Sequence, residues 1–406
     1  MQHRPLSAPD IDRSASLGRT RGQQGPPAEG GSILVPPSAD TYVLRFPSAP
    51  SPALLTSLET GYGLVLQTLE GADSDFLGLF QGPENLDLQE VLQSAGDEVT
   101  DASPNERVLL AEDASLTGGF VVGEWDPDEM ATGSGLESLG LPTAHAVGVG
   151  SGVRIAILDT GADLTHPFLA SHIQPLPSGS TLVSYELLDG VDDDDDGEID
   201  EAYGHGTHVA GIILQVAPEA TLVPIRVLNA DGVGSLWDLL SGLNLAVQQD
   251  VQVVNLSIAM TSSNETMEGL LGKFESQYIK VVAAAGNAGL ESPTYPGTSS
   301  RTMGVAAVDG EGVLAPFSGG GPHIVLAAPG VSILSAFPDN RMARASGTSM
   351  ATAAASGAIA ILRDGIGMGS LQGALRLAET AASITPSGAV EAGTVSPIDA
   401  LGISRD

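Results

Sequence analysis

The sequence predicts an α/β protein with a mostly parallel central sheet between two layers of helices, preceded by a small α+β domain. Two observations predict the sheet. Apolar runs rich in β-branched residues lack polar alternation, which is typical of strands buried on both faces. These runs alternate with helix-like segments from residue 153 to residue 308. A third observation, a β-α-β-β-α-β order within about 70 residues, favours a ferredoxin-like small domain.

Residues 1–40 are rich in Pro, Gly, Ser and Arg and have no periodic hydrophobicity, so a disordered segment is expected there. The small domain is expected over 41–112. Its elements are predicted, in order, as strand 41–46, helix 52–61, strand 64–71, strand 75–81, helix 86–96 and strand 106–110. A linker rich in Gly, Asp and Ser (113–134) is expected to lead to the large domain (135–406).

The large domain is expected to hold buried parallel strands and helices packed on them. Its strands are predicted at 153–159, 221–228, 251–258, 280–286 and 302–308. One helix is predicted at 236–249. Another, at 351–363, is small and apolar around its whole circumference, so it is expected to lie inside the protein.

The composition excludes several classes of function. The formal net charge is −34, from 16 basic and 50 acidic residues, so nucleic acid is not an expected partner. With no Cys, the chain has no disulfide, thiolate metal site or cysteine nucleophile. No apolar run approaches about 18 residues, so no membrane span is expected.

Four polar residues stand at the ends of apolar segments. Asp159 ends a predicted strand, and His205 lies in GHGTHVAG just before a predicted helix. Ser349 lies in SGTSMA at the start of the buried helix, where backbone N–H groups have no partner within the helix. Asn287 ends AAAGN in a turn after a strand.

These four residue types supply what acyl transfer needs. A serine hydroxyl needs an imidazole to take its proton, and the imidazole needs a carboxylate to hold its tautomer. The tetrahedral intermediate needs hydrogen-bond donors, for which the Ser349 backbone N–H and the Asn287 amide are candidates. Asp159, His205, Ser349 and Asn287 are therefore the candidate catalytic residues.

The motifs ILDTGAD, GHGTHVAG, AAAGN and SGTSMA, in that order, resemble those of the subtilisin-like serine proteases (subtilases), over about residues 135–402. The resemblance implies a three-layer fold and a serine endopeptidase that forms an acyl-enzyme on Ser349. It implies a self-processed precursor, in which 41–112 is an inhibitory and chaperone propeptide, with cleavage somewhere in 108–135. Protein or peptide substrates and a monomer are expected. An extracellular or periplasmic location is also expected, although no signal peptide is recognisable at this N-terminus.

The resemblance also implies a substrate cleft. The residues expected to flank an extended substrate backbone, on two strands, are Ser257, Ile258, Ala259, Gly232 and Gly234. Those expected to line the pocket for the residue before the scissile bond are Ala284, Ala285 and Gly286. Their small apolar walls predict a preference for large apolar side chains. Ala259 stands where the family usually has Gly, which affects the shape of this pocket.

The acidic run DDDDDGEIDE (192–201) is the candidate metal site. It partly fits an EF-type calcium loop with ligands from Asp192, Asp194, Asp196 and Asp200. Tyr203 stands where that loop has its final Glu. Charge runs are more often solvated turns. Both interpretations stay open, so Ca²⁺ is a candidate cofactor that the chemistry does not require.

Three alternatives stay open. ILDTGAD also resembles the D-T-G-A turn of retroviral-type aspartic proteases, but that interpretation needs a homodimer and leaves GHGTHVAG and SGTSMA unexplained. The protein could also be a catalytically silent scaffold, or its acyl-enzyme could ligate peptides. Pepstatin sensitivity and fluorophosphonate labelling would separate the aspartic, silent and serine interpretations.

Overall fold

A seven-stranded sheet forms the centre of the large domain, and every neighbouring pair of its strands is parallel, as predicted. The strand order is β17-β14-β13-β12-β10-β7-β8. The strands are β7 (Arg154–Asp159), β8 (Thr221–Arg226), β10 (Val253–Leu256), β12 (Lys280–Ala284), β13 (Thr302–Val308), β14 (Leu326–Pro329) and β17 (Gly393–Thr394). This computed structural model describes residues 34–35, 37–72, 75–111, 119–381 and 393–402.

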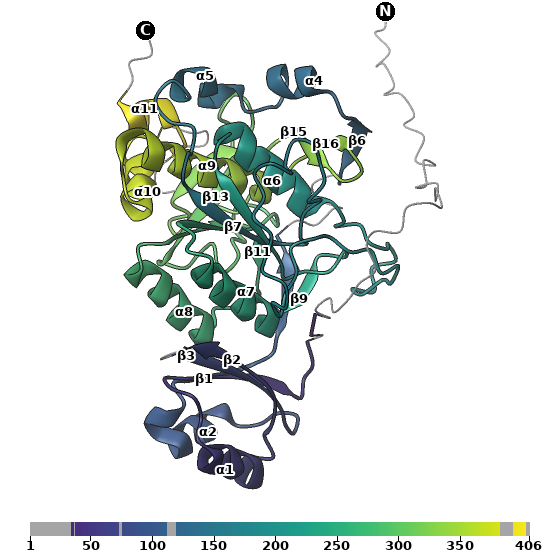
Figure 1. Cartoon of the computed structure of the whole chain (residues 1–406), viewed down its shortest axis with the longest axis vertical. Coiled ribbons are helices and arrows are strands. Elements are labelled where there is room, and N and C mark those ends of the chain that lie inside the picture. Colours follow the sequence, from purple (N-terminus) through teal and green to yellow (C-terminus); the bar gives the residue numbers. More distant parts are fainter. Residues whose placement is uncertain (1–33, 36, 73–74, 112–118, 382–392, 403–406) are drawn as a thin grey trace, which may run out of the picture. The chain divides into compact units, whose positions relative to one another are not determined.

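Helices cover both faces of this sheet (Figure 1), with α6 (His205–Val216) and α9 (Thr348–Ile366) on one face and α7 (Leu236–Gln248) and α8 (Glu265–Ser276) on the other. The side chains of β7 explain the layers. Ile155 and Ile157 pack in the apolar cluster of α6 and α9, whereas Ala156 and Leu158 pack in the cluster of α7 and α8. Both faces of the strand are buried, so it has no polar alternation. The predicted three-layer α/β fold is confirmed.

The small domain has the predicted β-α-β-β-α-β order, and its antiparallel sheet has the order β2-β3-β1-β4. Its elements are β1 (Thr41–Phe46), α1 (Pro52–Tyr62), β2 (Val65–Ala72), β3 (Asp75–Gln81), α2 (Leu88–Ala95) and β4 (Asp101–Pro104). Phe46, Leu58 and Phe80 are buried in an apolar cluster of its own. The domain therefore has its own core.

The prediction of a closing strand at 106–110 was wrong about its partner. β4 closes the small sheet, whereas β5 (Arg107–Leu110) pairs with β9 (Val233–Ser235) and β11 (Ile258–Ala259) of the large domain. A short apolar run predicts a strand but not the strand with which it pairs, which explains the error. The position of β5 is central to the candidate site below.

The linker predicted at 113–134 contains regular structure in its described part. β6 (Val121–Glu124) pairs with β16 (Arg341–Ala345), and α4 (Pro127–Thr132) follows. Residues 112–118 lie outside the described residues, as do residues 1–33, on which most of the predicted disorder falls. The other elements are η1 (Gly96–Glu98), η2 (Glu137–Leu139), α5 (Leu141–Ala144), β15 (Ile333–Phe337), α10 (Ser370–Glu379) and α11 (Pro397–Leu401).

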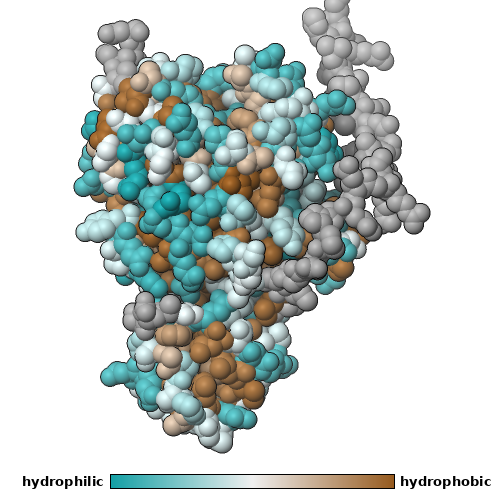
Figure 2. Space-filling model, in the orientation of Figure 1, coloured by the Kyte–Doolittle hydropathy of each residue, from teal (hydrophilic) through white to brown (hydrophobic). Residues whose placement is uncertain are grey.

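Hydrophilic residues occupy much of the face of the large domain that Figure 2 shows, in keeping with the net charge of −34. Lys273 of α8 donates to Asp75 of β3 at 2.9 Å, which adds an ion pair between the large and small domains. None of the helices in the described ranges is long and apolar enough to cross a membrane.

Candidate active site

Asp159 and His205 come from two neighbouring elements of the large domain. Asp159 is the last residue of β7, and His205 is the first residue of α6. His205 Nδ1 lies 2.7 Å from Asp159 Oδ1, and both side chains are buried. The Thr160 N–H donates to the same carboxylate oxygen at 2.8 Å. An imidazole held in this way by Nδ1 can use its Nε2 as a general base.

Two glycines allow this contact. A Cβ on Gly206, the residue after His205, would lie 1.9 Å from the carbonyl oxygen of Gly161. Gly161 itself has φ +103°, and a Cβ there would lie 2.6 Å from the carbonyl carbon of Tyr185. Three backbone segments therefore pass closer together than side chains would permit. The glycines of ILDTGAD and GHGTHVAG thus bring Asp159 and His205 together.

Ser349 and Asn287 come together at the beginning of α9. Ser349 is the second residue of α9 and is fully buried. Asn287 lies in the turn after β12, and its Oδ1 accepts a hydrogen bond from the Thr348 N–H at 3.0 Å. The Gly286 N–H donates to Thr348 Oγ1 at 3.2 Å. These bonds fix the Asn287 amide beside the backbone N–H groups that begin the helix.

An extended segment of the chain itself lies between the two strands that were expected to flank a substrate. β5 pairs with β9 in the register Val108–Gly234, and with β11 in the registers Leu109–Ala259 and Leu110–Ile258. The Leu110 N–H donates to the Gly232 carbonyl oxygen at 2.7 Å, and the Ala111 N–H donates to that of Ser257 at 3.0 Å. Every predicted flanking residue therefore contacts the segment 107–111.

This segment ends at the candidate oxyanion donor. Asn287 Nδ2 donates to the carbonyl oxygen of Ala111 at 2.8 Å. Ala111 is only 6% exposed. Asn287 thus joins the carbonyl of Ala111 through Nδ2 to the first turn of α9 through Oδ1. An amide donor in this place can polarise the carbonyl of a peptide bond that is about to be cleaved.

The three residues predicted to line the adjoining pocket are consecutive and buried. Ala284 ends β12, and the carbonyl of Ala285 accepts the Thr294 N–H at 2.9 Å. Gly286 has φ +91°, and a Cβ on it would lie 2.7 Å from the Thr294 side chain. Gly286 is therefore required by both its backbone conformation and the space around it.

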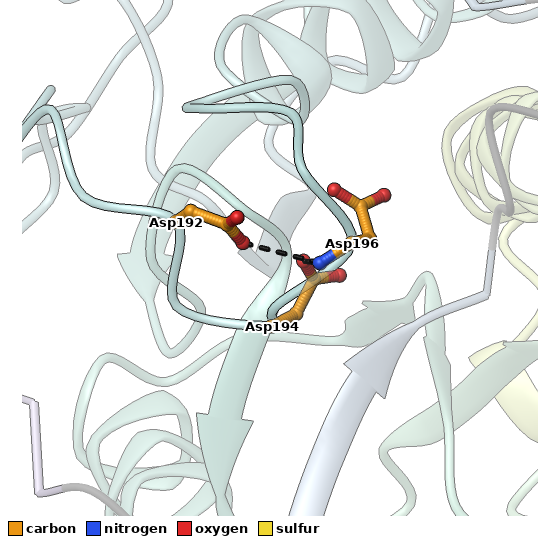
Figure 3. A group of neighbouring side chains, drawn as sticks. All are labelled: Asp192, Asp194 and Asp196. Carbon is orange, nitrogen blue, oxygen red and sulfur yellow. Dashed lines mark hydrogen bonds between the residues drawn. The ribbon is translucent and has the colours of Figure 1, made fainter.

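Three of the four predicted metal ligands come together (Figure 3). One oxygen each from Asp192, Asp194 and Asp196 lies within 4.8 Å of the others. Asp200 does not join them, because its carboxylate accepts the N–H groups of Asp189 and Gly190. The Asp196 N–H donates to both Asp192 and Asp194 at 3.2 Å, so the loop folds around its own carboxylates.

Sequence reasoning missed three residues around the Asp159–His205 pair. Glu186 Oε1 accepts hydrogen bonds from the Thr207 N–H at 3.0 Å and from its hydroxyl at 3.1 Å. It also lies 3.4 Å from Thr160 Oγ1. Burial raises the pKa of Glu186 to about 8. The two threonines lie inside the motifs and could have been found, whereas no sequence pattern singled out Glu186.

The model of the subtilase family, Peptidase S8, matches residues 150–382, which is more than half of the chain. The chain belongs to the subtilase family of serine peptidases.

Curated relatives match over the same region. The thermostable alkaline protease of Halalkalibacterium halodurans is 36% identical over 239 residues, which is 56% of this chain and 62% of that protein. Subtilisin BL of Lederbergia lenta is 37% identical over 56% of this chain and 83% of its own length. Thermitase of Thermoactinomyces vulgaris is 33% identical over 58% of this chain and 84% of its own length. The chain therefore matches less than two thirds of the first of these proteins.

Proposed function

We propose that the chain is a serine endopeptidase that hydrolyses peptide bonds through an acyl-enzyme on Ser349. The observation that carries this proposal is the double contact of Asn287. It joins the carbonyl of a strand in the cleft to the beginning of the helix that holds Ser349. The buried Asp159–His205 pair and the family membership support the same activity.

Each residue has a role in the proposed reaction. His205 accepts the Ser349 proton as the hydroxyl attacks the scissile carbonyl, and Asp159 stabilises the imidazolium that forms. The oxyanion of the tetrahedral intermediate receives hydrogen bonds from Asn287 Nδ2 and the Ser349 backbone N–H. His205 then protonates the leaving amine. Water, activated by the same imidazole, releases the acyl group and restores the hydroxyl.

We also propose that the small domain and β5 form an inhibitory propeptide, cleaved after Ala111. The segment 107–111 occupies the cleft as an extended substrate would, and the Ala111 carbonyl faces the oxyanion donor. Asn105 supports the docking of this domain, because its Oδ1 accepts the Trp237 N–H at 2.9 Å in the first turn of α7. The proposed bond lies inside the predicted 108–135 window.

The substrates are proposed to be proteins or peptides bound in the extended form of β5. The residue before the scissile bond is Ala111 in the chain's own segment, which fits apolar walls. The predicted preference for large apolar residues is a separate expectation, and a peptide library tests it. Preferred cleavage after Arg or Asp would contradict it. Extracellular or periplasmic action of a monomer is also proposed, and fractionation followed by light scattering tests both.

Asp192, Asp194 and Asp196 are proposed to hold Ca²⁺. Their three oxygens are hard ligands that lie within 4.8 Å of one another, which suits a cation of this kind. A bound cation would relieve the repulsion among these carboxylates and hold the loop that precedes His205. It would supply stability, and no step of the reaction depends on it. Calorimetric titration with calcium tests binding.

A fluorophosphonate probe tests the enzyme class. The purified chain should form an adduct that peptide mapping places on Ser349. A His205→Ala variant should lose the adduct while keeping its fold, because the hydroxyl then has no base. Pepstatin should have no effect. Absence of an adduct in the wild-type enzyme, or an equal rate of labelling in H205A, would contradict the proposal.

A further inference from the structure

A second buried carboxyl group lies close to the catalytic pair, and the mechanism above does not use it. Glu186 lies in the segment that passes Gly161, between β7 and α6. Its Oε1 accepts both the N–H and the hydroxyl of Thr207, two residues after His205. Its Oε2 is buried and has no hydrogen-bond partner among the described residues. One of its two oxygens therefore lacks the hydrogen bonds that an ionised carboxylate requires.

Thr160 connects this carboxyl to the catalytic aspartate. Its Oγ1 accepts the Gly206 N–H at 3.1 Å. The same oxygen lies 3.4 Å from Asp159 Oδ1 and 3.4 Å from Glu186 Oε1. A hydroxyl has a single hydrogen, so Thr160 can donate to only one of the two carboxyl groups. If both were ionised, the other carboxylate would face the threonine oxygen without a hydrogen between them.

We propose that Glu186 is a positioning residue that acts in its protonated form: with the proton on Oε2, Oε1 competes only weakly for the Thr160 hydroxyl, which then donates to Asp159. The single hydrogen of the Thr160 hydroxyl is thereby left for the carboxylate that holds His205. The contacts of Glu186 to Thr207 tie the first turn of α6 to the same point. Glu186 thereby fixes the catalytic pair from two sides. This inference rests on the proposed serine endopeptidase activity.

The surroundings of the carboxyl agree with a neutral acid. Burial, helped by nearby Asp159 and Asp163, raises its pKa to about 8 against the opposing effect of the Thr207 hydrogen bonds. Tyr203 and Arg226 also interact with it electrostatically. Glu186 should therefore lose its proton as the pH rises through about 8. A second negative charge then lies near Asp159, and both carboxylates compete for the single hydrogen of the Thr160 hydroxyl.

The experiment compares E186Q and E186A with the wild-type enzyme in kcat and KM between pH 6 and pH 10. Glutamine supplies a donor and an acceptor without a titratable proton. We expect the wild-type kcat to fall between pH 7 and pH 9, with KM unchanged, and this fall to be absent in E186Q. E186A should lose about tenfold in kcat at pH 6.5, because the catalytic pair is no longer fixed. E186Q should recover most of that loss.

Controls separate a positioning role from a structural one. D364A removes a carboxylate that accepts the Val149 N–H near the other end of α9, so it should lower the thermal midpoint without changing the pH profile. If E186A does not finish its processing within the purification, the rate at which the full chain is cut after Ala111, followed by intact mass, replaces kcat.

Two outcomes would overturn the inference. In one, E186Q is as impaired as E186A at pH 6.5, which would mean that the ionised form is needed. In the other, both variants have the wild-type profile, or only their thermal midpoints change. An unlabelled wild-type chain would instead overturn the proposed function itself, and with it the role of Glu186.

Discussion

Asn287 makes two contacts at the centre of the candidate site. Its Oδ1 holds the N–H of Thr348, and its Nδ2 holds the carbonyl of Ala111. The first bond orients the amide, so Nδ2 already points at the position of the scissile carbonyl before a substrate binds. A donor that is oriented in advance stabilises a developing oxyanion more than a mobile one. The contribution of this residue should therefore appear in kcat.

We predict that N287A lowers kcat by about 10²–10³-fold with little change in KM, a magnitude established for the corresponding donor in subtilisin. The reason is that the amide stabilises the transition state more than the bound substrate. Steady-state kinetics with a peptide substrate measure both constants. N244A is a matched control, because Asn244 is a buried amide of α7 whose Nδ2 has no hydrogen-bond partner among the described residues. A rise in KM alone would contradict the predicted role.

Residue patterns predicted the candidate triad and Asn287 but not their neighbours. Each of the four residues stands in a motif at the end of a strand or the start of a helix, so its position along the chain indicates its place in the fold. Glu186 has no such context, because it lies in a loop whose path depends on Gly161. The contact between Glu186 and Thr160 is a property of the folded chain.

At the scale of elements, the acidic loop before α6 shows how local hydrogen bonds shape a candidate ion site. Asp192 accepts the N–H groups of Asp196 and Gly197, so the loop is already curved around its carboxylates. Asp200 was expected as a fourth ligand, but it accepts N–H groups from the beginning of the same loop. Position in an EF-type pattern could not reveal this second use of the carboxylate.

We predict that chelation of calcium lowers the thermal midpoint of the wild-type protein by several degrees, because binding to the folded state alone stabilises it. A D192N/D196N variant should have a low midpoint that neither calcium nor chelator changes. D309N is a suitable control, since Asp309 also accepts two N–H groups of its own loop but belongs to no such cluster within the described residues. Equal responses of all three proteins to chelation would exclude the site.

The pairing partners of β5 could not be predicted from its own sequence. Its apolar residues predicted a strand, yet its partners β9 and β11 lie more than a hundred residues away. Val108 is fully buried in the core cluster that includes residues of α7 and α8. The choice between closing the small sheet and entering the cleft depends on tertiary packing, which local periodicity does not contain.

At the scale of the whole molecule, the large domain was the most predictable part. Its strands are apolar on both faces and follow one another with helices between them, and this pattern defines a parallel three-layer fold. The described part of the predicted linker was less predictable: β6 within it is exposed along its whole length, and its pairing with β16 depends on residues far along the chain. A four-residue strand that is exposed throughout has no alternation of buried and exposed residues for periodicity to detect.

The two domains join through several kinds of contact. Lys273 of the large domain donates to Asp75 of the small domain, and Val35, which precedes the small domain, donates its N–H to both oxygens of buried Asp238 at 3.3 and 3.1 Å. Ser103 of β4 lies 3.0 Å from the Thr266 hydroxyl of α8. Together with β5, these contacts hold the chain's own segment in the cleft. A segment bound in this way would have to leave the cleft before a substrate could enter.

The central claim is that Ser349 cleaves the chain after Ala111, and the mass of the mature protein tests it most directly. Intact mass and N-terminal sequencing should show that the wild-type enzyme begins at Glu112. A Ser349→Ala variant prepared in parallel should keep the small domain covalently attached. The account would be contradicted if S349A had the same mature N-terminus, or if the wild-type chain were cut at a bond that lies outside the segment held by Asn287.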